Sequence, residues 1–249
     1  MKKSLIILSL VLAVSGFLFA QKKTTPSTSS CNDLPKDKLF EHYHAVYNQA
    51  VKYNDLVVAR EAIFNMLILK PERTGLKDTL TYIYYNSNNY VQVILTGKEI
   101  LESAPDKAEI IELVAVSQQN LGLLKEALES FEKLFSISKD TYHQYNIASL
   151  QYMLKRYGEC SESLNAILGS ADTSGVVTIS DGKSDSQQVP IKAAAFNMRG
   201  VIALEINQPD VAKQNFEKAL QLFPEFVLAK NNLEKTAVEE KKNPSEKKN

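Results

Sequence analysis

The feature that most constrains the fold of this chain is a repeat of about 34 residues. Pro71 and Pro105 lie 34 residues apart, and each ends a segment in which small and aromatic residues recur with helical spacing. This period is typical of stacked helix pairs, because one pair cannot bury its apolar face alone and must pack on its neighbours. The sequence therefore predicts an all-α solenoid that works through a surface.

The clearest copy of the repeat starts at Ala193. Its small residues would let two antiparallel helices approach closely, Phe216 would fill the space between them, and Pro224 would end the second helix because it has no N–H to donate. The pattern is carried by Phe196, Gly200, Ala203, Ala212, Phe216, Ala219 and Pro224. It resembles the tetratricopeptide repeat family, and this resemblance implies a right-handed α-solenoid of about five helix pairs.

Steps of 34 residues divide the rest of the chain into similar units. The predicted solenoid covers 36–240, with units at 40–73, 74–107, 108–141, 142–169 and 193–226. The fourth unit is degenerate, because Asn165 stands where an aromatic residue is expected. An amphipathic helix over 226–239 would cap the solenoid, and the charged, apolar-poor tail 240–249 is expected to be disordered.

An insertion over 170–192 separates units four and five. The β-prone runs 176–180 and 187–191 flank a centre rich in turn-forming residues. We expect a short β-hairpin or ordered loop here, with a flexible loop as the alternative. Pro190 cannot donate to a strand ladder, so any such hairpin is an edge element.

Residues 1–20 have the features of an export signal. Lys2 and Lys3 precede an uncharged run that is shorter than the roughly 20 apolar residues that span a bilayer comfortably. A flexible polar linker over 21–35 is expected to follow the signal. Because of the signal, the mature protein is expected in the periplasm. Leu18 stands where a small residue is preferred before a cleavage site, which leaves an uncleaved N-terminal anchor as the alternative.

The two cysteines do not form a disulfide framework. Cys31 lies 11 residues after Ala20, too far from the hydrophobic run for a lipid anchor. After export a Cys31–Cys160 disulfide would be chemically allowed. The simpler interpretation is that Cys31 is a thiol of the linker and Cys160 a small helix residue that packs near Tyr157.

The composition and motifs offer no chemistry for catalysis. Without residues 1–20 the chain has 27 basic and 29 acidic residues, which argues against a nucleic-acid or anionic membrane surface. Residues 182–184 resemble the end of a phosphate-binding loop, but Val177 stands where that motif needs glycine. His42 and His44 point about 200° apart on a helix and cannot share a metal. We therefore expect no enzyme activity, metal or cofactor.

The resemblance also implies where a ligand would lie. In this family ligands usually occupy the concave face, at the second, fifth, ninth, twelfth and thirteenth residues of each unit. From these places we select as partner-binding residues Tyr82, Tyr85, Asn86, Glu112, Gln119, Asn120, Asn146, Leu150, Met153, Asn197 and Val201. Tyr82 and Tyr85 offer flat amphipathic contacts. The apolar residues Leu150, Met153, Leu154, Val201 and Leu204 would form a strip for a partner helix, or would pack against adjacent first helices.

These observations favour a non-enzymatic periplasmic scaffold that binds an envelope protein or peptide segment in the concave groove. We expect no nucleic-acid partner and no membrane insertion beyond the signal segment. The alternative function is a glycan- or nutrient-binding component of an envelope uptake complex, which would use the inserted loop together with the tyrosines of the groove.

Overall fold

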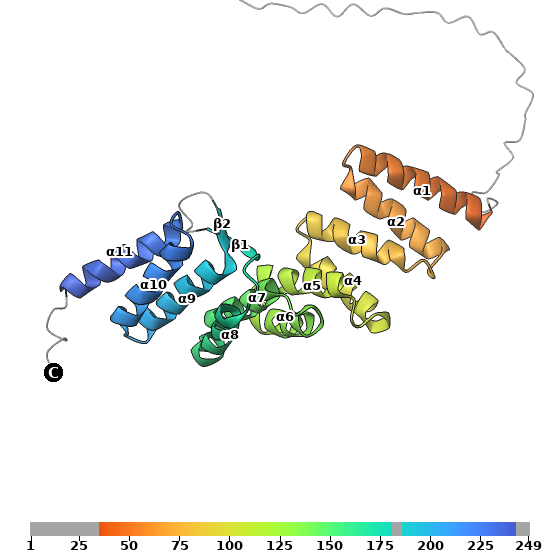
Figure 1. Cartoon of the computed structure of the whole chain (residues 1–249). Coiled ribbons are helices and arrows are strands. Elements are labelled where there is room, and N and C mark those ends of the chain that lie inside the picture. Colours follow the sequence, from red (N-terminus) through yellow and green to blue (C-terminus); the bar gives the residue numbers. More distant parts are fainter. Residues whose placement is uncertain (1–34, 181–185, 243–249) are drawn as a thin grey trace, which may run out of the picture.

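The computed structural model describes residues 35–180 and 186–242, which form eleven helices and two strands (Figure 1). The helices are α1 (Lys36–Lys52), α2 (Leu56–Leu69), α3 (Gly75–Asn86), α4 (Tyr90–Ser103), α5 (Ala108–Asn120), α6 (Leu124–Ser138), α7 (Thr141–Met153), α8 (Tyr157–Gly169), α9 (Ile191–Glu205), α10 (Pro209–Leu222) and α11 (Val227–Lys242). The strands are β1 (Val176–Ile179) and β2 (Gln187–Pro190). The predicted signal, Cys31 and nearly all of the predicted linker lie outside the described residues.

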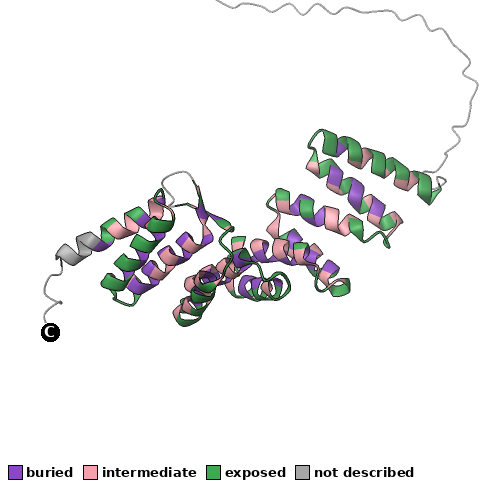
Figure 2. Ribbon diagram, viewed as in Figure 1, coloured by how far each residue is buried: buried purple, intermediate pink, exposed green. Residues whose placement is uncertain are grey.

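Consecutive helices pack as pairs, and each pair packs on the next. The five pairs from α1/α2 to α9/α10 follow one another along an arc, and α11 packs on α10 at the end (Figure 1). Buried residues lie mainly between the helices, and the outward faces are exposed (Figure 2). The predicted all-α solenoid of five helix pairs with a C-terminal helix is confirmed.

One backbone feature recurs in every pair and sets the register of the repeat. The turn between its two helices contains one residue with a left-handed backbone, a conformation that favours glycine and asparagine. These residues are Asn54, Asn88, Gly122, Lys155 and Asn207, with φ between 56° and 74°. Four of them are the fifteenth residue of units that start at 40, 74, 108 and 193. Lys155 is the fifteenth only if the fourth unit starts at Thr141, one residue before the predicted start.

The cause of this shift lies in the connection between α6 and α7. The links α2–α3 and α4–α5 contain Pro71 and Pro105, whereas only Lys139 and Asp140 join α6 to α7. Lys139 ends α6 in a left-handed conformation, with φ of 55°. A short link of this kind removes one residue from the repeat, so a count in fixed steps of 34 overshoots.

The core of the fourth unit follows the shifted register. Its buried residues Ala148, Cys160, Leu164 and Ile167 correspond to Ala115, Ala127, Phe131 and Leu134 of the third unit, each 33 residues earlier. A hydrogen bond repeats with the same spacing: Ser130 Oγ donates to Gln118 Oε1 at 2.7 Å, and Ser163 Oγ donates to Gln151 Oε1 at 2.8 Å. The interpretation of Asn165 as the residue that replaces the aromatic was wrong, because Leu164 fills that place and Asn165 is exposed.

Cys160 is a core residue of this unit. Its side chain is fully buried, Tyr157 packs against the same cluster, and the thiol donates to the carbonyl oxygen of Ala148 at 3.1 Å. Burial raises the pKa of the Cys160 thiol to about 12, so the reactive thiolate is scarce at neutral pH. A disulfide would therefore require α8 to open first.

The described part of the insertion between α8 and α9 contains the expected hairpin. β1 pairs antiparallel with β2, and the facing side chains of Val177 and Val189 are buried. Gln187 fastens the hairpin to the start of α11: its Nε2 donates to the carbonyl oxygen of Glu225 at 2.8 Å, and the backbone N–H of Val227 donates to its Oε1 at 2.9 Å. The hairpin is thus held against α9 and the start of α11.

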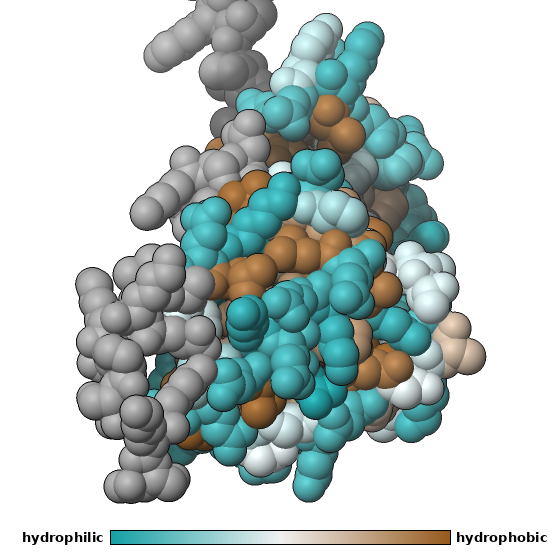
Figure 3. All heavy atoms as spheres, turned by 60° about the vertical axis from the view of Figure 1, so that its left-hand side comes forward, coloured by the Kyte–Doolittle hydropathy of each residue, from teal (hydrophilic) through white to brown (hydrophobic). Residues whose placement is uncertain are grey.

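The C-terminal helix differs slightly in extent from the predicted cap. It begins at Val227 and runs to Lys242, so residues 240–242, assigned to the tail from sequence, are helical. Figure 3 shows the molecule with its C-terminal side turned toward the viewer. The surface seen there is largely hydrophilic, and apolar residues form a strip between the polar ones. Among the described residues, no helix is both long and apolar enough to cross a membrane.

Candidate functional site

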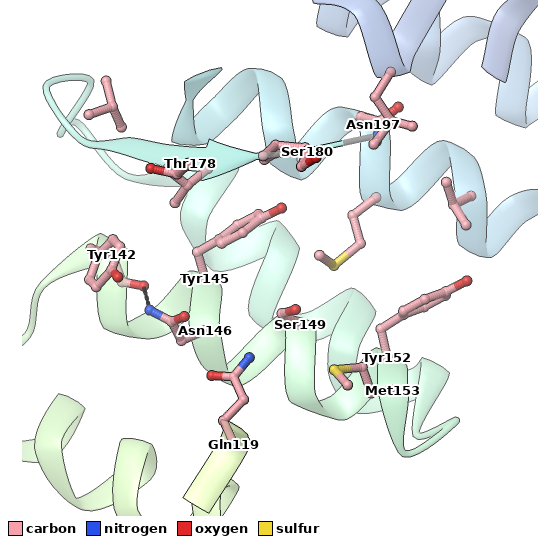
Figure 4. A pocket seen from close by; sticks show the side chains of 16 residues that line it. Gln119, Tyr142, Tyr145, Asn146, Ser149, Tyr152, Met153, Thr178, Ser180 and Asn197 are labelled. Carbon is pink, nitrogen blue, oxygen red and sulfur yellow. Dashed lines mark hydrogen bonds between the residues drawn. The ribbon is translucent and has the colours of Figure 1, made fainter. Parts of the chain in front are cut away.

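A groove of about 550 Å³ lies on the inner side of the arc, between the first helices of units three to five and the hairpin (Figure 4). Its lining residues come from α5, α7, α9, α11, β1 and Ser180, which follows β1. They are Gln119, Tyr142, Tyr145, Asn146, Ser149, Tyr152, Met153, Val176, Val177, Thr178, Ile179, Ser180, Asn197, Met198, Val201 and Leu228. The hairpin therefore closes one side of a groove that the helices alone would leave open.

Helix α7 supplies the longest wall. Its lining residues recur every three or four positions from Tyr142 to Met153, so they share one face of the helix. Burial raises the pKa of Tyr145 well above its usual value, and burial together with the Glu205 carboxylate raises the pKa of Tyr152. Both phenols are therefore uncharged at neutral pH and present hydroxyl groups above large apolar rings.

The opposite wall is formed by α9, α11 and β1. Met198 and Leu228 contribute apolar surface, and Asn197 contributes an amide. The Asn232 Nδ2 atom donates to Asn197 Oδ1 at 3.0 Å, which fixes the orientation of the Asn197 side chain. In Figure 4, β1 runs across the groove above Tyr145, and the side chains of α7 and α9 face each other below it.

The described lining carries no Asp, Glu, Lys or Arg side chain. Its polar groups are amides and hydroxyls, and its apolar groups are tyrosine rings, the thioethers of Met153 and Met198, and aliphatic side chains. Within the described residues, no group of three or more His, Cys, Asp or Glu side chains is placed to hold a metal ion. The groove suits a neutral, amphipathic ligand bound by packing and by hydrogen bonds.

The structure brings five of the sequence-selected residues together in the groove. They are Gln119, Asn146, Met153, Asn197 and Val201. Met153 is the most accessible of them, with 49% of its surface exposed, whereas Asn197 is buried, with 5% of its surface exposed. These five residues come from three different units, which is what a ligand that follows the inner face would require.

Five other selected residues lie outside this groove. Tyr82 and Asn86 are exposed on α3, and the ring of Tyr85 packs edge-on against Tyr90, with ring centroids 6.3 Å apart. Glu112 Oε1 lies 3.9 Å from His143 Nε2. The exposed Asn120 donates from Nδ2 to the carbonyl oxygen of Val116 at 2.8 Å. Their role in binding stays a prediction.

The selection of Leu150 as a partner-binding residue was wrong. Its side chain has no exposed surface and packs in the core of unit three and unit four, so it cannot contact a partner. Leu154 is half-buried against the same cluster. For these two residues the alternative interpretation, packing between adjacent helices, is the right one.

Sequence reasoning selected none of the three tyrosines of the lining, and it gave the inserted loop a part in binding only in the alternative function, without naming its residues. The shifted register would have found the aromatic part. Counted from Thr141, the second, fifth, ninth, twelfth and thirteenth residues are Tyr142, Tyr145, Ser149, Tyr152 and Met153. All five line the groove.

Comparisons with known proteins agree with this geometry. The fold is an α-solenoid of stacked helix pairs with a groove on its inner side. Residues 193–226 match the family model of the tetratricopeptide repeat, and a search of curated proteins finds no match. Residues 193–226 are thus a tetratricopeptide repeat, as the resemblance implied.

Solved structures show the same fold. YrrB, described as a tetratricopeptide repeat protein with an unusual peptide-binding site, is 16% identical, covers 80% of this chain and 97% of its own, and has a TM-score of 0.59. MamA from Desulfovibrio magneticus RS-1 is 10% identical, covers 76% of this chain and 97% of its own, and has a TM-score of 0.56. At these identities the likeness concerns the fold alone.

Proposed function

We propose that this protein is a non-enzymatic periplasmic adaptor that holds an uncharged, partly apolar segment of an envelope protein in the groove. The observation that carries the proposal is the groove itself: an inner-face site built from tyrosine, methionine and amide side chains, without a charged residue in its described lining. The tetratricopeptide repeat fold supports a protein–protein interaction scaffold. The unusual peptide-binding site ascribed to YrrB adds support by analogy.

The mechanism rests on preorganisation. The lining residues stand on helices packed into a continuous core, so a bound segment meets side chains that are already aligned. Tyrosine and methionine suit this role, because tyrosine adds a large contact area at a low entropy cost and methionine adapts its shape. Affinity should then depend on a few central side chains rather than on the whole inner face.

Selection of peptides from a displayed random library against the purified protein tests this function. We expect the selected peptides to lose roughly tenfold or more in affinity, about 1.4 kcal/mol, when Tyr142 and Met153 are both replaced by alanine. Both side chains are exposed, so these changes leave the core intact. Tyr53→Ala, an exposed tyrosine in the turn between α1 and α2, serves as the control and should change affinity less than about twofold.

Three further outcomes define this test. Binding should change little between low and high salt, because the described lining carries no charge. Equal losses in the groove variant and in the Tyr53 control would show that the loss of affinity does not come from the groove. Failure to select any peptide that the groove variant weakens would contradict the proposed function.

The periplasmic location rests on the sequence of residues 1–20. Fractionation of cells that produce the full chain tests it: osmotic shock should release the protein in a form shorter by about 20 residues. A full-length protein in the membrane fraction would support the uncleaved anchor instead. Recovery in the cytoplasm would contradict export.

One observation favours a second candidate, binding of a neutral glycan. Tyrosine rings and amides are also the groups that stack on sugars and bind their hydroxyls, and the groove combines three of each: Tyr142, Tyr145 and Tyr152 with Gln119, Asn146 and Asn197. A glycan array run beside the peptide selection separates the candidates. Glycan binding that is lost in the same groove variant, without peptide binding, would favour an uptake component.

A further inference from the structure

The hairpin has an unpaired edge that borders the groove. β1 and β2 form a two-stranded sheet, so each strand has one side without a strand partner in the described structure. Residues 176–180 all line the groove, and none of the four residues of β2 does. The groove therefore lies on the side of β1 that faces away from β2.

The pairing register shows which backbone groups point to that side. The N–H of Ile191 donates to the carbonyl oxygen of Gly175 at 3.0 Å, which makes the next pair, Val176 with Pro190, a pair without mutual hydrogen bonds. Since the two kinds of pair alternate, the pair of Thr178 with Gln188 is also of this kind. Val176 and Thr178 thus direct their N–H and C=O groups away from β2, toward the groove.

Pro190 fits this arrangement. It stands where no N–H is needed for the ladder, so the hairpin forms in spite of the proline. The free edge of β1 is short, but its composition does not protect it: the sequence Val-Val-Thr-Ile contains no proline and no charge. An unprotected edge of β-branched residues beside a recessed apolar surface is a template for another strand.

We propose that the bound segment adds to β1 as a third strand. This inference rests on the proposed function, and it names the ligand class: an extended segment of four or five residues, matched to the roughly 13 Å length of β1. Side chains of the bound segment that lie on the same face of the sheet as the buried Val177 pack on Tyr145, Met198 and Leu228. The alternate side chains point to solvent with Val176 and Thr178, so apolar residues are required at every second position only.

Backbone chemistry tests this proposal. In a peptide selected against the groove, N-methylation of single residues in turn should weaken binding roughly tenfold or more at alternate positions and change it little at the positions between them. In an extended strand, only every second residue directs its N–H toward β1, so N-methylation removes a hydrogen bond to β1 only at those residues. Equal effects at successive residues would overturn strand addition, as would helical chemical shifts of the bound peptide in NMR spectra.

A matched pair of variants addresses the protein side. Thr178→Pro removes the outward N–H without removing a bond to β2, and should weaken peptide binding roughly tenfold. Thr178→Val keeps the backbone N–H and should weaken peptide binding clearly less than Thr178→Pro does. Both variants lose the hydrogen bond from Gln188 Nε2 to Thr178 Oγ1, so that contact cancels in the comparison.

The outcomes separate the two proposals. If the Tyr142 and Met153 variant weakens binding but Thr178→Pro and N-methylation do not, the groove binds peptides and strand addition is wrong. If no selected peptide depends on the groove, the proposed function fails and strand addition fails with it. Should Thr178→Pro disturb the hairpin, which NMR spectra of the free protein would reveal, the N-methylation series decides alone.

Discussion

Replacement of Gly200 by leucine should lower the free energy of unfolding by roughly 1–3 kcal/mol. A Cβ atom at Gly200 would lie 2.3, 2.6 and 2.8 Å from three ring atoms of Phe216, closer than side-chain carbons approach in proteins. The ring cannot easily move aside, because Phe216 is fully buried on α10 and packs against Ala203 and Ala212. The absence of a side chain at Gly200 is thus what lets α9 and α10 touch.

Gly158 provides the matched control for this prediction. It lies in α8, is exposed, and a Cβ there would meet no atom within 4 Å. Gly158→Leu should leave stability unchanged or raise it by up to about 1 kcal/mol, because leucine favours the helix more than glycine does. Urea unfolding followed by circular dichroism measures both variants. A Gly200 variant as stable as the parent would show that the α9–α10 crossing is not tight.

The fold could be predicted from the sequence because its signals are local. Small residues such as Ala212 and Ala219 and the aromatic Phe216 recur at helical spacing in the clearest unit, and the other units keep part of this pattern. Stacking of such units is the physical outcome of their one-sided apolar faces. The hairpin was visible for the same reason, as two β-prone runs around a turn-rich centre. Neither required knowledge of contacts between distant residues.

The register of the fourth unit could not be predicted in this way. It depends on the two-residue link at Lys139 and Asp140, and a fixed period cannot show a link that is shorter by one residue. The error moved the selected positions on α7 by one residue, which rotates them by about 100° around the helix. One of the displaced positions, Leu150, is a core residue, and three tyrosines of the groove were missed.

Contacts between distant residues explain the other omissions. β1 borders the groove only because the hairpin folds back over α7 and α9, which nothing in the sequence of 170–192 specifies alone. In the second unit, Gly97 stands where Phe131 and Phe216 stand in other units, and Val114 of the next unit occupies the space. The sequence of a unit alone does not show that a residue of the next unit fills the space left by its glycine.

The shifted register makes a sharp prediction of its own. Leu164→Ala should lower the free energy of unfolding by roughly 2–5 kcal/mol, because it opens a cavity in a fully buried position between α7 and α8. Asn165→Ala, one residue further along, should change it by less than about 0.5 kcal/mol, since that side chain is exposed. The two substitutions sit in the same helix and leave the same residue behind, so they differ only in what the lost side chain touched.

Hydrogen exchange is the suitable measurement, because units of a solenoid can open separately and a global melting curve would average them. Amides of α7 and α8 should exchange faster in Leu164→Ala than in the parent, while those of α1 and α2 keep their rates. If Asn165→Ala speeds exchange as much as Leu164→Ala does, the unit begins at Tyr142 after all. The repeat would then no longer explain the aromatic wall of the groove, because only a unit that starts at Thr141 places Tyr142, Tyr145 and Tyr152 on the inner face.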